Sequence, residues 1–168
     1  MIIDIDTATD YLKADSDDED LITAMIAGAQ SICQGYCNRV FYATQDDANA
    51  DFTQALLDQT AQKASYKALL AGTTDTDQKS LITNHYIEVF GRIKQRVNGV
   101  VIDDTITAAM LLTLGHLYAN REDNVASGNN VVQVPVGAQR ILQPYLWIGD
   151  IADNVPEGYE DGCWTPGS

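Results

Sequence analysis

Apolar residues recur every three or four positions through most of this chain, which is the spacing of one face of an α-helix. The cleanest run lies within residues 82–97 and consists of Ile82, Tyr86, Val89, Phe90, Ile93 and Val97. The same spacing predicts a long helix over about 18–37 and another over 103–121. With 168 residues, the chain suits one compact domain. We therefore predict an all-α fold, a small helical bundle with a long central helix.

Residues that start and stop helices divide this pattern into segments. The predicted N-caps are Thr7, Asp46 or Asp47, and Asp103 or Asp104. The predicted ends are Asn38, Gly72 and Asn98. Val100, Val101 and Ile102 form a short extended piece, and a last helix after Pro135 should end or kink at Pro144. Residues 122–134 are predicted to be a polar loop that could hold a short hairpin.

The predicted helix over 103–121 is apolar nearly all round. The apolar residues that recur every three or four positions form one face of this helix, and Leu111, Leu112 and Tyr118 lie outside that face. Such a helix is either central in a core or shared with another subunit. These three residues are therefore candidates for a subunit interface.

The charge balance restricts the classes of partner. Acids outnumber bases 24 to 10, for a net charge of −14, which argues against wrapping nucleic acid by neutralising phosphates. It does not exclude a protein past which DNA slides without being held. Bases gather only in the middle of the chain, where Arg92, Lys94 and Arg96 could face DNA or an acidic partner. The alternative is a solvated face whose cations complement the end of their helix.

Nothing in the sequence indicates an enzyme, a metal site or a cofactor. No nucleophile elbow, phosphate loop or dinucleotide fingerprint is present. Cys33 and Cys37 lie four apart on one helix face, but the further ligands that they would need have no companions at metal-binding spacing. The start of the chain lacks the basic flank of a signal peptide, and its apolar stretches are too short to span a membrane. An odd number of cysteines favours folding in a reducing cytoplasm.

Two segments carry a resemblance. The first contains LKAD at 12–15 and DEDL at 18–21, and the second contains PVGAQRILQPY at 135–145. Together they resemble the head–tail connector (adaptor, head-completion or DNA-packaging) proteins of tailed bacteriophages, although Ile141 stands where the pattern often has Leu. The likeness covers about 1–42 and 103–148. It lapses over 43–102, which we therefore interpret as an insertion of two helices within a domain spanning 1–148.

The resemblance implies a structural virion protein that forms a ring of about twelve subunits beneath the portal. It would connect capsid to tail, line the DNA channel without sequence-specific binding, and contact the portal protein and a tail or stopper protein. Its place would be the head–tail interface of the virion, and the host cytoplasm during assembly. The alternative is another helical phage assembly or interaction module without a ring role.

The last twenty residues, 149–168, are predicted to be an extended C-terminal tail. The segment is acidic, is interrupted by Pro and Gly, and has no periodic pattern that could bury its apolar side chains locally. Aromatic residues dominate interface hot spots. Ile151, Tyr159 and Trp164 are therefore candidates for docking on the portal or on a neighbouring subunit.

Overall fold

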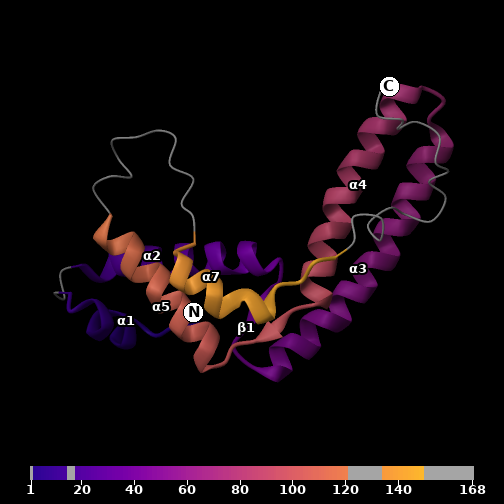
Figure 1. Ribbon diagram of the computed structural model, residues 1–168. Helices are drawn as coiled ribbons and strands as arrows, with labels where there is room; N and C mark the ends of the chain where they lie inside the picture. Colours follow the sequence, from indigo (N-terminus) through magenta and orange to yellow (C-terminus); the bar gives the residue numbers. More distant parts are fainter. Residues whose placement is uncertain (1, 15–17, 121–133, 150–168) are drawn as a thin grey trace. The chain divides into compact units, whose positions relative to one another are not determined.

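The computed structural model describes residues 2–14, 18–120 and 134–149. Within these ranges six α-helices, one 3₁₀ helix and one two-stranded sheet make up the regular structure (Figure 1), so the predicted all-α fold is confirmed. None of the described helices is both long and apolar enough to cross a membrane. The contacts divide the chain into two units. The first combines the described residues up to Ala50 with those between Asn98 and Trp147, and the second is built around Asp51–Val97.

The first unit begins with α1 (Ile5–Leu12). Its N-cap is Asp4, whose carboxylate accepts hydrogen bonds from the Thr7 backbone N–H at 2.8 Å and from the Thr7 hydroxyl at 2.7 Å. The prediction that Thr7 caps this helix is therefore wrong. Asp4 competes better because a carboxylate can accept from the backbone and from the hydroxyl at once.

Helix α2 (Glu19–Cys37) matches the predicted long helix. It ends at Asn38, which has the left-handed φ of 54° that the predicted helix terminator requires. The core face of α2 packs mainly against α5. Its buried residues are Ile22, Ile26, Ala29, Cys33 and Cys37.

Helix α5 (Asp104–Ala119) lies at the centre of the first unit and contacts α1, α2 and α7. Its buried residues are Ile106, Ala109, Met110, Thr113 and Leu114. Helix α7 (Val136–Leu142) continues into the 3₁₀ turn η2 (Gln143–Tyr145), which contains Pro144 as expected. Most of the apolar surface of α5 is therefore covered by helices of its own unit.

A two-stranded parallel sheet closes the first unit. Strand β1 (Phe41–Tyr42) pairs with β2 (Val100–Val101) in the register Phe41 to Val100. The extended piece near 100 was predicted, but its partner was not. The pairing joins residues almost sixty positions apart, so no local pattern marks it.

The second unit is a helical hairpin. Helix α3 (Gln45–Gly72) and helix α4 (Thr76–Val97) run side by side in opposite directions (Figure 1). Thr44 caps α3, because its hydroxyl oxygen accepts from the Asp47 N–H at 3.1 Å, so the predicted cap at Asp46 or Asp47 is wrong by two or three residues. Asp75 caps α4 by accepting from the Asp77 and Gln78 backbone N–H groups.

The hairpin has a narrow core of its own. Its buried apolar residues are Ala55, Tyr66, Tyr86, Phe90 and Ile93. The rings of Tyr66 and Tyr86 pack with centroids 5.1 Å apart. The Tyr86 hydroxyl donates to Ser65 Oγ at 2.8 Å. Aromatic packing and satisfied hydroxyls therefore hold the two helices together.

Candidate interaction surfaces

The start of α5 is tied to the end of the last helical turn. Asp103 accepts a hydrogen bond from the Ile106 backbone N–H at 2.8 Å, and its other carboxylate oxygen accepts from the Tyr145 hydroxyl. The bond from Tyr145, followed by that from Ile106, lowers the pKa of Asp103. Asp103 was a predicted cap, and it also links η2 to α5.

Replacing Asp103 with alanine is expected to lower the free energy of unfolding by about 1 kcal/mol, the usual effect of losing an N-cap. Because folding lowers the pKa of Asp103, its contribution is present above its unfolded pKa of about 3.9 and is lost as the pH falls through the folded value. Urea unfolding at pH 7 and at pH 3 measures both. Tyr145→Phe is the control, since it removes one bond and keeps the cap. An equal loss at both pH values would contradict the assignment.

The three interface candidates on α5 have different surroundings. Leu111 is partly buried against the core of its own unit. Tyr118 is also partly buried, and its hydroxyl donates to Asp18 Oδ2 at 2.8 Å, which ties α5 to the N-cap of α2. Leu112 is 39% exposed. Of the three, Leu112 presents the most surface to a partner.

Leu112 belongs to a small apolar patch shared by α5 and the start of α7. Val136 is 66% exposed. The adjacent Gly137 lies so close to α5 that a Cβ built on it would be 3.9 Å from Leu112 Cδ1. We call Leu112 and Val136 the α5–α7 patch. Its position on the first unit makes it the best candidate there for a contact between subunits.

The basic residues of α4 are not equivalent. Arg96 is held by two acids of α3, with 2.6 Å from Nη2 to Asp51 Oδ1 and 2.6 Å from Nη1 to Asp58 Oδ2. These bonds raise the pKa of Arg96, and the bond to Arg96 is the main cause that lowers the pKa of Asp58. Lys94 is partly buried. Because its charge is already neutralised by α3, Arg96 is a poor candidate for a DNA contact.

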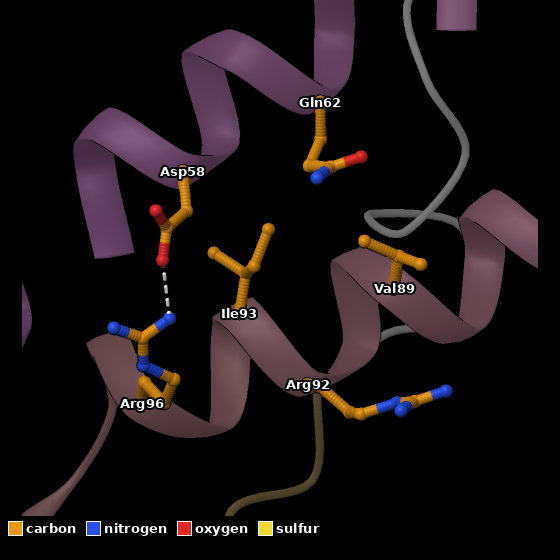
Figure 2. Close-up of a pocket in the computed structure, with 6 residues that line it drawn as sticks. All are labelled: Asp58, Gln62, Val89, Arg92, Ile93 and Arg96. Carbon is orange, nitrogen blue, oxygen red and sulfur yellow. Dashed lines mark hydrogen bonds and ion pairs between the residues drawn. The ribbon is translucent and has the colours of Figure 1, made fainter. Parts of the chain in front are cut away.

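Arg92 lies beside this ion pair, at the edge of a hollow of about 210 Å³ between α3 and α4. Figure 2 shows Val89 and Ile93 in the hollow, with Asp58 and Arg96 at one end and the Arg92 side chain extending away from them. Arg92 is exposed and makes only a loose pair with Glu88 at 3.6 Å. The hollow therefore combines an apolar floor of Val89 and Ile93 with the Asp58–Arg96 ion pair at one end.

The two cysteines of α2 are free thiols in the core. Cys33 Sγ lies 3.4 Å from the Thr113 hydroxyl of α5. Burial raises the pKa of both thiols, for Cys37 to about 11. In the part of the chain that the structure describes, no group of three His, Cys, Asp or Glu side chains could hold a metal ion.

Alkylation of Cys33 and Cys37 at pH 8 is therefore expected to require unfolding. A thiol with a pKa of about 11 is ionised to only about one part in a thousand at that pH, and the thiolate is the reactive form. In a Cys163→Ser variant, iodoacetamide should leave the native protein unmodified and add two groups in denaturant, as mass spectrometry would show. Rapid modification of the native protein would mean that the core around α2 is open.

The tail candidates Ile151, Tyr159 and Trp164 lie outside the described residues, as does most of the predicted polar loop. Their docking role stays a prediction. The sequence analysis also missed the acids that bind Arg96. Asp51 and Asp58 are seven residues apart, which puts them on one face of α3. That spacing was the available signal.

No known protein family, no curated protein and no solved structure matches this chain.

Proposed function

We propose that this chain is a structural virion protein of a tailed phage that forms a ring beneath the portal, connects capsid to tail and lines the DNA channel. One observation carries the proposal. The two segments with the connector resemblance, 1–42 and 103–148, are about sixty residues apart in sequence. Nevertheless, α1 and α2 from the first segment share one core with α5 and α7 from the second. A shared core supports the resemblance, because both segments belong to a single module.

Surface and charge are consistent with this role. The α5–α7 patch leaves apolar side chains exposed on the same module, where a neighbouring copy could cover them. Outside residues 51–97 the chain carries nineteen acids and four bases. Carboxylates facing a channel repel phosphate and let DNA pass without binding it. The partners would be further copies of the chain, the portal protein, and a tail or stopper protein.

Particle images of the purified protein, alone and mixed with the portal protein, test the proposal. Closed rings of about twelve subunits on the portal are the expected result. The free subunit can be monomeric, because ring contacts can form cooperatively on a template. A protein that stays monomeric beside the portal, in a phage whose purified virions lack it, would instead support the alternative, a helical assembly module without a ring role.

A further inference from the structure

One face of α3 in the hairpin is both apolar and basic. Phe52, Leu56, Lys63 and Lys67 follow one another at spacings of four, seven and four residues, which places them on one side of the helix. Phe52 is 43% exposed and Leu56 is 42% exposed, and both lysines are exposed. We call these four residues the α3 outer face. It extends over about 22 Å, at 1.5 Å per residue.

The hairpin cannot cover this face by itself. Only one side of α3 meets α4, and within the described residues the shared core consists of five buried side chains. Phe52 and Leu56 lie one helical turn apart on the same side of α3, so their partly exposed side chains are neighbours along the helix surface. This strip of two apolar side chains, with Lys63 and Lys67 further along the same side of α3, is a surface on which an apolar and acidic segment could dock.

Charge indicates which partner. Residues 51–97 carry six bases and five acids, whereas the rest of the chain carries four bases and nineteen acids. Among the described residues, neither Lys63 nor Lys67 forms an ion pair. Residues 51–97 are therefore the stretch of the chain in which bases outnumber acids and are most concentrated. An acidic segment with apolar side chains would complement the α3 outer face.

We propose that the C-terminal segment 150–168 of the same chain docks on the α3 outer face. This segment has five acids and no base, and it contains Ile151, Tyr159 and Trp164. Its carboxylates match Lys63 and Lys67, and its aromatic rings match the strip of Phe52 and Leu56. Lysines beside Trp or Tyr add cation–π attraction. Docking would therefore bury the apolar side chains of Ile151, Tyr159 and Trp164, which are costly to expose to water, against the apolar surface of Phe52 and Leu56.

The chain path allows this docking. The Trp147 backbone N–H donates to the Cys37 carbonyl at 2.9 Å, and the Asn38 side chain donates to the Trp147 carbonyl at 3.4 Å. The C-terminal segment therefore leaves the first unit beside the end of α2, and α3 begins only seven residues after Asn38. Nineteen residues can span up to about 63 Å when extended, well beyond the length of α3. A segment starting there can reach every residue of the α3 outer face.

Once docked, the C-terminal segment and the α3 outer face would cover each other in the free subunit. This inference goes beyond the proposed connector role. It concerns the isolated subunit and stands whether or not rings form on a portal.

Trp164 fluorescence in the full-length chain tests the docking. A Trp147→Phe background leaves Trp164 as the single tryptophan and keeps the backbone bond of residue 147 to Cys37. We expect Trp164 to emit at shorter wavelength, and to be quenched less by acrylamide, than in a synthetic peptide of residues 149–168. Lys63→Glu with Lys67→Glu should move both readouts toward the peptide values. In the chain with Lys63 and Lys67 unchanged, about 1 M salt should also weaken docking. Salt at that concentration shortens the screening length to about 3 Å and so reduces the attraction between the lysines and the carboxylates of the segment.

The matched control is Lys13→Glu with Arg140→Glu, which changes the net charge equally but alters exposed bases of the first unit. It should leave Trp164 shielded, and far-UV circular dichroism should show both variants folded. Trp164 values equal to those of the peptide in the unaltered chain would overturn the proposal. So would an equal effect of the two double variants. Shielding that disappears on dilution would also overturn it, because the occupant would then be the segment of a second copy.

Discussion

Leu114→Ala is expected to lower the free energy of unfolding of the first unit by about 2–5 kcal/mol. Leu114 is fully buried in α5, and α5 lies between α1, α2 and α7. Removing most of its side chain deletes apolar contacts and leaves a cavity that the surrounding helices cannot fill completely. Urea unfolding followed by Trp147 fluorescence, in a Trp164→Phe background, reports on this unit.

Leu112→Ala on the same helix is the matched control. Leu112 is 39% exposed, so the same change should cost about 1 kcal/mol or less. The two units of the chain can unfold in separate transitions. Trp147 lies in the first unit, so its fluorescence reports the unfolding of that unit alone. Equal losses for the two variants would contradict the orientation of α5.

Leu112→Asp is expected to abolish ring assembly while leaving the subunit folded. If the α5–α7 patch is the contact between copies, the change places a charge in a desolvated apolar interface. Burying a leucine contributes up to about 1.5–3 kcal/mol, and a ring repeats this at every interface. Particle images with the portal protein and circular dichroism of the free subunit measure assembly and folding separately.

Two further variants sharpen this test. Leu81→Asp makes the same chemical change at a hairpin residue that is 69% exposed, and rings should persist. Leu111→Asp should instead destabilise the free subunit, because Leu111 packs against its own core. Normal rings with Leu112→Asp would rule out the α5–α7 patch as the subunit contact.

Local sequence signals were sufficient to predict most helices and several of their ends. The three- and four-residue spacing in α2 and α4 indicated the faces that are buried, and Asn38 and Asp103 act as the predicted terminator and cap. These features depend on side chains within a few positions of one another. The predicted positions of the caps of α1 and α3 differ by two or three residues from the observed caps, Asp4 and Thr44. Several neighbouring side chains can offer an oxygen to the same free N–H groups at a helix start, so the sequence alone did not select one.

The sequence by itself determined the helical class of this protein, the apolar character of α5 and the acidic balance of the chain. Only the tertiary structure decided which apolar residues of α5 are covered. Leu111 and Leu112 are chemically identical neighbours, yet the first is partly buried and the second presents its side chain to solvent. The pairing of Arg96 with Asp51 and Asp58 was likewise decided by packing. Helix formation depends on contacts three or four residues apart, whereas these outcomes depend on which helices lie beside each other in space.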